Sequence, residues 1–471
     1  MLSISSRIYE TKMENSLSED ALYNLMDREY KLQNELSQYN IHEDKVQRHK
    51  LIYDYLLEVL REPNLPSVHF DCNWEWFNTQ TPLTTDHLLG RTTVLDFFTY
   101  CCINCMHVLP DLDALEKQVE DILIIGVHSA KFENEKLSLN IRNAIERYGI
   151  GHAVVNDSQA VLWKQYLISC WPTFMVLDPN GKPIKKFVGE GHGEELIEFV
   201  HIAKELFAEL KLNGNGSLEL PGMSLGNTMQ PSFLSYPGKI HASSTGQIII
   251  SDTSHHRIII VDESTSEVQM ILGSGRRGYL DCDDATKAEF NSPQGICLVE
   301  PNDLYICDTA NHCIRLCNLT TRKVTTVAGN TKQGKDYQGG LLGSAQALAS
   351  PWDICLGYSP SSLENKGDPD VLYIAMAGTH QIWGYMLADT VWWKKVERKA
   401  GRCYAIAGSG AEENRNTSYP LKAGFAQPSG IAYDRECDIL YIADSESSSI
   451  RKMSIKDGSV NKLIGGGRYV N

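Results

Sequence analysis

The spacing of hydrophobic residues divides the chain into three parts, and the first is a polar segment at residues 1–62. Apolar side chains recur there at helical intervals, most clearly at Ile52, Tyr55, Leu56, Val59 and Leu60. This pattern predicts two or three amphipathic helices that end before Pro63. We expect these helices to pack against the next domain; a partner-binding arm is the alternative.

Residues 63–212 alternate between short apolar runs and longer helical patterns. The predicted elements are, in order, a strand at Val94–Phe98, a helix at Leu109–Val119, a strand at Ile122–Val127, helices at Leu137–Tyr148 and Val161–Tyr166, strands at Phe174–Leu177 and Ile184–Val188, and a helix at Glu194–Lys211. Such alternation predicts an α/β domain whose central sheet is covered by helices on both faces.

An internal repeat replaces the helical pattern in residues 213–471. Residues 213–217 read Asn-Gly-Asn-Gly-Ser, which predicts a flexible boundary. Four units of about 56 residues follow, and each has a proline three residues before an isoleucine, at Pro237, Pro293, Pro351 and Pro428. Each unit contains about four short apolar runs, a pattern that predicts the blades of an all-β propeller.

A turn in each predicted blade is marked by a fixed spacing. Asp252, Asp308 and Asp444 each precede an isoleucine by six residues, and Met376 takes this place in the third blade. We expect the three aspartates to accept N–H bonds in the turn. Four blades before Asn471 form an open arc with exposed apolar faces, so further blades or a partner are expected to complete the ring.

Composition and charge narrow the function classes. A length of 471 residues implies two or three domains. The formal net charge of −15 argues against a nucleic-acid partner, because phosphate binding needs a positive surface. No apolar run reaches 18 residues and the N-terminus does not resemble a signal peptide, so we expect no membrane association and a cytosolic location.

Of the thirteen cysteines, only one closely spaced pair suggests chemistry. Most lie in apolar strands, as small buried residues of a reducing compartment do. Cys102 and Cys105, however, form a Cys-x-x-Cys where the Val94–Phe98 strand meets the next helix. There the helix N-terminus favours the thiolate, and this pattern predicts a redox site.

A metal site is the weaker alternative for these thiols. It would use Cys101, Cys102, Cys105 and His107, but four ligands so close in sequence cannot easily surround one tetrahedral ion at a helix start. We therefore predict neither a metal nor a cofactor.

The α/β domain resembles the thioredoxin fold, on three separate features. The Cys-x-x-Cys stands at the redox motif, Asp96 lies six residues before Cys102, and Pro172 follows Trp171 just before a strand. The resemblance implies that Cys102 is the attacking thiolate, Cys105 the resolving thiol and Asp96 its general base. It also implies that Pro172 holds the substrate backbone close and keeps metal from the thiols.

Three departures from the family pattern concern the redox motif. Cys101 stands where thioredoxins usually have tryptophan, and the pair between the cysteines is Ile103 and Asn104 in place of Gly-Pro. Cys170 adds a thiol beside the proline loop and could form an alternative disulfide with Cys102.

The segment from Trp74 to Gly90 resembles the entry of membrane-anchored bacterial thioredoxins of the TlpA and ResA type.

The repeats resemble NHL repeats, with His256 and Arg257 in the first blade and Asn311 and His312 in the second. Propellers of this family usually have six blades, and their faces commonly bind proteins. The union of the two domain types resembles a family of multidomain proteins, which implies a cytosolic location, a role in animal development, further blades and a C-terminal β domain. Protein partners are therefore expected on the propeller face, and a disulfide-containing protein as substrate.

Two hypotheses remain open for function. The chain is either a protein-interaction scaffold with a thiol–disulfide site at Cys102 and Cys105, or an active thiol–disulfide oxidoreductase whose propeller selects protein substrates.

Overall fold

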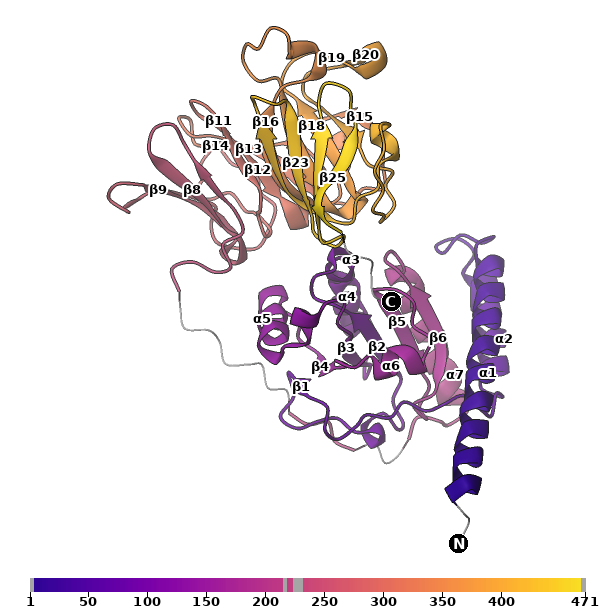
Figure 1. The fold of residues 1–471 in the computed structure, drawn as a ribbon. Coiled ribbons are helices and arrows are strands. Elements are labelled where there is room, and N and C mark those ends of the chain that lie inside the picture. The colour runs from indigo at the N-terminus through magenta and orange to yellow at the C-terminus, as the bar shows by residue number, and fades with distance from the viewer. Residues whose placement is uncertain (1–3, 215–217, 223–231, 467–471) are drawn as a thin grey trace. The chain divides into compact units, whose positions relative to one another are not determined.

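The computed structural model describes residues 4–214, 218–222 and 232–466 (Figure 1). The predicted boundary at residues 213–217 therefore lies partly outside the described residues. The chain forms two compact units, residues 1–229 and 230–471.

The first unit is built on a six-stranded sheet in the order β1-β4-β3-β2-β5-β6. The strands are β1 (Trp76–Phe77), β2 (Thr93–Phe98), β3 (Leu123–His128), β4 (Ala153–Asn156), β5 (Thr173–Leu177) and β6 (Pro183–Val188). β2 is central, parallel to β3 and antiparallel to β5, and all six of its residues are buried. The predicted thioredoxin-like α/β fold is confirmed.

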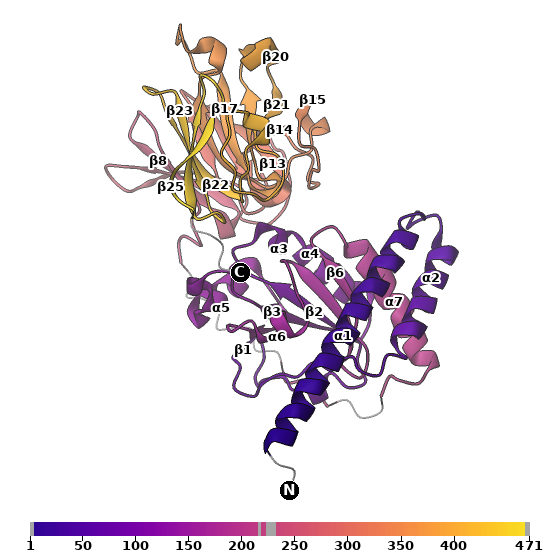
Figure 2. The same cartoon turned by 45° about the vertical axis from the view of Figure 1, so that its right-hand side comes forward.

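Helices cover both faces of this sheet (Figures 1 and 2). They are α1 (Ile4–Leu36), α2 (Lys45–Val59), α3 (Ile103–His107), α4 (Leu109–Gln118), α5 (Ser138–Tyr148), α6 (Val161–Gln165) and α7 (Gly193–Glu209). α5 packs over Phe98 and Val154 on one face, and α4 and α7 share the larger apolar cluster of the other face. The sequence prediction omitted β1 and β4 because each is too short to show an alternating pattern.

The N-terminal helices α1 and α2 pack on α7 and β6 (Figure 2). Arg48 donates to Glu198 of α7 at 2.6 Å, and the Tyr55 hydroxyl donates to the carbonyl of Ile184 at 2.7 Å. Leu22, Leu25 and Ile52 join the core of the sheet domain. Among the helices in the described stretches, none has the length and apolar character needed to span a bilayer.

The second unit consists of four successive antiparallel sheets and one separate two-stranded hairpin, so the four predicted propeller blades are confirmed. Blade 1 contains β7 (Ile240–Ala242), β8 (Gln247–Asp252), β9 (Arg257–Asp262) and β10 (Val268–Leu272); blade 2 contains β11 (Ile296–Val299), β12 (Asp303–Asp308), β13 (Cys313–Asn318) and β14 (Lys323–Ala328). Blade 3 contains β16 (Pro351–Gly357), β17 (Val371–Met376), β18 (Gln381–Met386) and β21 (Arg402–Ala407), with β15 (Gly339–Leu342) added at its edge. Blade 4 contains β22 (Pro428–Asp434), β23 (Ile439–Asp444), β24 (Ser449–Ser454) and β25 (Val460–Gly465). Between β18 and β21 of blade 3, the chain also forms a separate hairpin of β19 (Thr390–Trp392) and β20 (Val396–Arg398).

Blades 1, 2 and 4 have the predicted aspartate at the turn, but the backbone N–H that it accepts comes from the segment before the blade and not from the turn itself. Asp308 accepts the backbone N–H of Asn291 at 2.7 Å, and its second oxygen accepts from the buried guanidinium of Arg315 at 2.7 Å. Asp252 and Asp444 make the equivalent backbone contacts. Each carboxylate therefore ties the segment that enters its blade to the second strand of that blade.

Replacing Asp308 with alanine is expected to destabilise the propeller by about 3 kcal/mol, because Arg315 would keep its buried charge without this partner. Urea unfolding followed by tryptophan fluorescence measures the loss. The control is Asp389→Ala, which breaks an exposed pair with Lys399 and should cost about 0.5 kcal/mol or less. Equal losses in both variants would contradict a structural role for the buried pair.

Candidate thiol–disulfide site

The candidate site lies where β2 ends and α3 begins. The buried strand delivers the chain to Phe98, and a tight turn follows in which the N–H of Cys102 donates to the carbonyl of Thr99 at 3.2 Å. Cys102 is the N-cap residue of α3, with extended backbone angles (φ −82°, ψ 116°). Its side chain thus stands at the helix N-terminus, where the unpaired N–H groups favour negative charge.

The two thiols of the motif contact each other but differ in accessibility. Cys102 is 5% exposed and Cys105 is fully buried. Burial, and secondarily a hydrogen bond with Cys102, raises the pKa of Cys105 well above that of an ordinary thiol. Cys105 is therefore held as the protonated partner beneath a slightly more accessible Cys102.

Asp96 lies on β2 below this pair, in register with Gly126 of β3 and Phe174 of β5. Its side chain is buried, and neither carboxylate oxygen has a hydrogen-bond partner among the described residues. Burial raises the pKa of Asp96 to about 8, and its charge adds to the high pKa of Cys105. The two groups are close enough to interact electrostatically, as proton exchange between them requires.

The loop before β5, which contains Cys170 and Pro172, contributes Trp171 to the apolar cluster around the motif. Trp171 and Pro172 are joined by a cis peptide bond, and Trp171 packs in the same apolar cluster as Cys102 and Cys105. The Trp171 indole N–H donates to the carbonyl of Ser129 at 3.0 Å. Cys101 and Cys170 are half-buried, and all thirteen cysteines are present as thiols.

Two further residues belong to the site: Glu135, which gave no signal in the sequence, and His128, whose place at a strand end predicts a hydrogen-bonded structural histidine but whose ring nitrogens have no hydrogen-bond partner among the described residues. The buried carboxylate of Glu135 accepts from the Thr99 hydroxyl at 2.7 Å and from the Cys101 N–H at 3.3 Å, so it fixes the turn that carries the thiols. The ring of His128 stacks on Tyr100 with centroids 5.4 Å apart, and burial lowers the His128 pKa to about 4. An uncharged imidazole therefore lies beside the turn at neutral pH.

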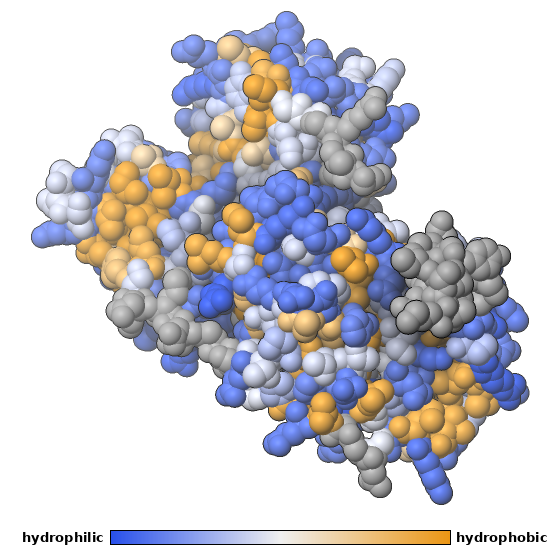
Figure 3. All heavy atoms as spheres, turned by 60° about the horizontal axis from the view of Figure 1, so that its bottom comes forward, coloured by the Kyte–Doolittle hydropathy of each residue, from blue (hydrophilic) through white to orange (hydrophobic). Residues whose placement is uncertain are grey.

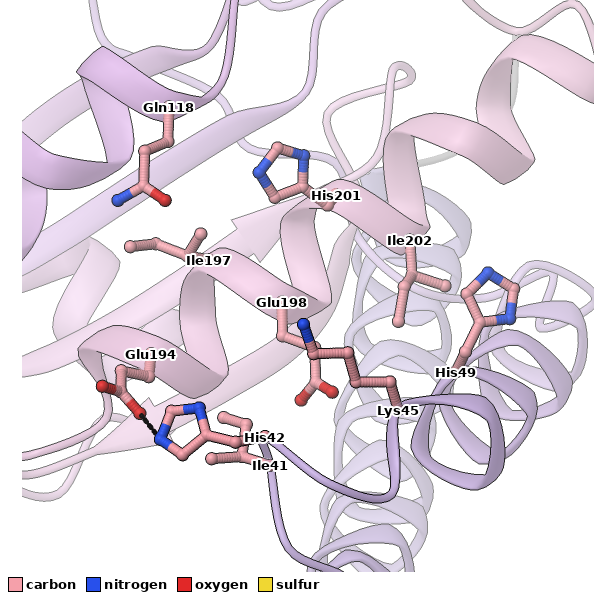
Figure 4. A pocket seen from close by; sticks show the side chains of 10 residues that line it. All are labelled: Ile41, His42, Lys45, His49, Gln118, Glu194, Ile197, Glu198, His201 and Ile202. Atoms are coloured by element: carbon pink, nitrogen blue, oxygen red, sulfur yellow. Dashed lines mark ion pairs between the residues drawn. The ribbon is translucent and has the colours of Figure 1, made fainter.

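Other parts of the described chain offer no second site of comparable chemistry. Over the stretches that the structure describes, no three His, Cys, Asp or Glu side chains are grouped to hold a metal ion. A surface pocket of about 500 Å³ lies between α2 and α7 and contains side chains of both charges, including His42, Lys45 and Glu194 (Figure 4). His42 lies 3.5 Å from Glu194, so part of the positive charge there is already paired when the imidazole is protonated.

Known proteins resemble both units. The family described as "Thioredoxin-like" matches residues 90–183, and the NHL repeat matches residues 290–315, at blade 2. NHL repeat-containing protein 2 of Homo sapiens is 44% identical over 431 residues, which cover 90% of this chain and 58% of that protein. Over most of its length, this chain is similar to NHL repeat-containing protein 2.

More distant relatives share all or part of this arrangement. Protein SUPPRESSOR OF QUENCHING 1, chloroplastic, of Arabidopsis thaliana is 40% identical over 425 residues, covering 88% of this chain and 38% of that protein. Thiol-disulfide oxidoreductase ResA of Geobacillus thermodenitrificans is 27% identical over 119 residues, covering 24% of this chain and 64% of that protein. The chain spans 58% of the length of NHL repeat-containing protein 2, so its relatives extend beyond the region that aligns.

Asp96→Asn is expected to make the protein more stable than the parent at pH 8. The folded-state pKa of about 8 exceeds the value of an unfolded aspartate, so the parent loses stability as pH rises from about 4 to about 8. Each unit of pKa displacement corresponds to about 1.4 kcal/mol. The advantage of the variant should therefore shrink toward pH 4, and urea unfolding across this pH range measures it.

A matched control for this substitution is Asp157→Asn. The carboxylate of Asp157 is also buried but accepts the backbone N–H groups of Val161 and Trp163. Burial raises the pKa of Asp157 too, but its replacement also loses hydrogen bonds to the carboxylate, so any gain in stability at pH 8 should be smaller than that of Asp96→Asn. A loss of stability in Asp96→Asn at pH 8 would mean that the Asp96 carboxylate has favourable partners in the folded state.

Proposed function

We propose that the chain is a protein-interaction scaffold whose thioredoxin-like domain carries a thiol–disulfide exchange site at Cys102 and Cys105. The observation that carries this proposal is the contact between the two thiols at a helix N-terminus, above a buried carboxyl group without a hydrogen-bond partner among the described residues. A pair of buried structural cysteines needs neither a helix N-terminus nor an acid beneath it.

The exchange reaction uses these groups in two steps. The Cys102 thiolate attacks a substrate disulfide, so that a mixed disulfide forms and one substrate sulfur leaves as a thiolate. Cys105 then transfers its proton to ionised Asp96 and attacks the Cys102 sulfur, which releases the second substrate thiolate. The pair ends as a Cys102–Cys105 disulfide, and the substrate has gained two electrons. The partner is thus a protein disulfide, and the next cycle requires an external dithiol.

The propeller is the proposed binding module for protein partners. Its blades present β-strand and loop surfaces, and the net charge of −15 for the chain disfavours nucleic acid. The polar loop between Tyr358 and Asp370 in blade 3 is held by hydrogen bonds from the Ser359 N–H and hydroxyl to Asp370. Such an anchored loop is suited to a specific contact.

The cytosol remains the proposed location. Cys297, Cys313 and Cys317 lie in the blades as thiols, which suits a reducing compartment. The plant relative named above is called chloroplastic, so relatives of this kind are found in more than one setting. We also propose a role in animal development, which the resemblance to multidomain proteins implies. Loss of the gene product in an animal tests this role, and rescue with Cys102→Ser tests whether the role needs the thiol.

The alternative function is an active oxidoreductase whose propeller selects the substrate. It is favoured by the contact of Cys102 with Cys105, by the interaction of Asp96 with Cys105, and by the loop of Trp171 and Pro172, whose indole packs in the same cluster as the thiols. Catalytic turnover separates the two functions. An oxidoreductase accelerates the reduction of a protein disulfide well above the rate of the supplied dithiol alone, whereas the redox-capable scaffold adds little to that rate.

Cys105→Ser is expected to accumulate mixed disulfides through Cys102, because the resolving thiol is gone. Non-reducing electrophoresis with mass spectrometry identifies the linked cysteine. Adding Cys102→Ser should abolish the adducts, and adding Cys170→Ser should leave them. The proposal is wrong if no adduct forms through Cys102 and the parent pair stays reduced across glutathione redox buffers.

A further inference from the structure

Blade 3 carries an insertion that the other three described blades lack. Between β18 and β21 the chain forms the β19–β20 hairpin, whereas short turns join the third and fourth strands of blades 1, 2 and 4. The hairpin projects from blade 3 (Figures 1 and 2). An isolated two-stranded hairpin is at most marginally stable in water, so contacts with the blades must hold this one in place.

Two tryptophans anchor the hairpin. Trp392 of β19 is buried, its ring lies edge-on to Tyr373 with centroids 6.2 Å apart, and its indole N–H donates to the Thr390 hydroxyl at 2.9 Å. The indole N–H of Trp393 donates at 2.9 Å to the carbonyl of Ile455, in the turn between β24 and β25 of blade 4. The hairpin is therefore fixed to both blade 3 and blade 4.

The turn of the hairpin contains two lysines in an unfavourable backbone conformation. Lys394 and Lys395 have φ angles of 59° and 60°, in the left-handed region, and both residues are exposed. Turns of this kind usually contain asparagine or glycine, because other residues are strained there. Strained residues that persist in a folded protein are often functional. The turn therefore suggests a function for the two ammonium groups.

An exposed aromatic ring adjoins the turn. Tyr419, in the segment before blade 4, is 60% exposed, and Leu421 beside it is 51% exposed. The Lys394 ammonium lies 6.0 Å from the centroid of the Tyr419 ring and the Lys422 ammonium 5.9 Å, at the outer limit of cation–π contact. We use the name hairpin surface for Lys394, Lys395, Val396, Tyr419, Leu421 and Lys422.

The three lysines of the hairpin surface form no ion pair with any described residue. Cations nearby in the chain do pair, Lys399 with Asp389 at 2.9 Å and Arg415 with Glu413 at 2.8 Å. Because the whole chain carries a net charge of −15, the three lysines are a local excess of positive charge. Val396, which is 44% exposed, adds apolar area beside them.

Exposed apolar residues on the blade faces have a different explanation. Ile240 of blade 1 is 73% exposed, and Figure 3 shows hydrophobic atoms gathered over this blade, at the left of that view. Blade faces pack against neighbouring blades in a propeller. The hairpin surface lies on an inserted hairpin and on the segment before blade 4, so the stacking of blades does not account for it.

We propose that the hairpin surface binds an acidic segment of a partner protein, in which Asp or Glu side chains flank one aromatic or aliphatic residue. The carboxylates pair with the three lysines, and the apolar residue covers Tyr419 and Leu421. This inference rests on the proposed role of the propeller as a binding module and specifies the surface and the chemistry of the partner. The thiol site plays no part in it.

An anionic membrane is less favoured as the partner. Three lysines are fewer than the four to eight cations that mark a typical polybasic membrane site. The net charge of −15 also repels the chain from an anionic bilayer, which extends far beyond the hairpin surface, whereas an acidic peptide contacts that surface alone.

Selection of a random displayed peptide library on the full chain tests the proposal. Clones that bind the parent but not the double variant Lys394→Glu/Lys395→Glu are expected to be rich in Asp and Glu around one Trp, Phe or Leu. The most enriched peptide, synthesised with a fluorescent label, should bind this variant at least tenfold more weakly in fluorescence anisotropy, and its binding to the parent should weaken as salt rises.

Two further variants separate the surface from the overall charge. The control Lys332→Glu/Lys335→Glu makes the same charge change at two exposed lysines outside the hairpin surface and should bind the peptide within twofold of the parent. Tyr419→Ser keeps the lysines and removes the ring, and it should weaken binding at least threefold. Circular dichroism and thermal unfolding check that each variant is folded.

The possible failures can be told apart. The inference is wrong if no clone distinguishes the parent from the hairpin variant, if the distinguishing clones are not acidic, or if both lysine variants lose binding equally. Selected peptides that bind the propeller elsewhere would overturn the hairpin surface but keep the propeller as a binding module. Binding of the parent, but not the hairpin variant, to phosphatidylserine vesicles without any distinguishing acidic clone would assign the surface to a membrane instead.

Discussion

The large sheets that the structure describes have apolar residues on both faces, and most of these faces are covered by another element because a sheet alone cannot remove them from water. In the first unit, helices provide this cover, with α5 on one side of the sheet and α4 and α7 on the other. In the second unit, blades cover one another through side chains such as Phe290 and Phe425. The same requirement thus produces a closed α/β domain in one half and a repeating array in the other.

The thiol site depends on this burial in a direct way. β2 is enclosed on both faces, so Asp96 lies in an apolar environment that favours its protonated form, and Cys105 is kept protonated beside it. The turn that follows β2 is nevertheless polar and well anchored, because the Glu135 carboxylate accepts hydrogen bonds from the Thr99 hydroxyl and the Cys101 N–H. Cys102 therefore lies between the apolar interior around Cys105 and the polar turn that Glu135 anchors.

The sequence predicted the parts of the fold that carry long or repeated patterns. The apolar run at Val94–Phe98 and the helix at Leu137–Tyr148 lie within one residue of β2 and α5. The four residues of β4 were missed because a strand so short, lying between two helices, has no period to detect. The blades were found because a proline three residues before an isoleucine recurs at a regular distance.

The site was only partly predictable, for a different reason. Cys102, Cys105, Asp96 and Pro172 stand at fixed spacings within a pattern that resembles thioredoxins. Glu135 belongs to a polar run that reads as an ordinary surface loop, and only the folded chain brings it beneath Cys101. No sequence pattern marked Phe290 or Phe425 either, because a lone apolar residue before a proline shows its packing partners only in the folded chain.

The burial of cysteines in the blades has a consequence for the reactivity of the whole chain. Burial raises the pKa of Cys297, Cys313 and Cys317 to about 12, so these thiols are almost entirely protonated at neutral pH and closed to reagents. Cys72 and Cys437 are exposed, and Cys101 and Cys170 are half-buried beside the motif. A protein with thirteen cysteines therefore responds to oxidants and alkylating agents as though it had only about half as many, and two of these, Cys101 and Cys170, belong to the region of the motif.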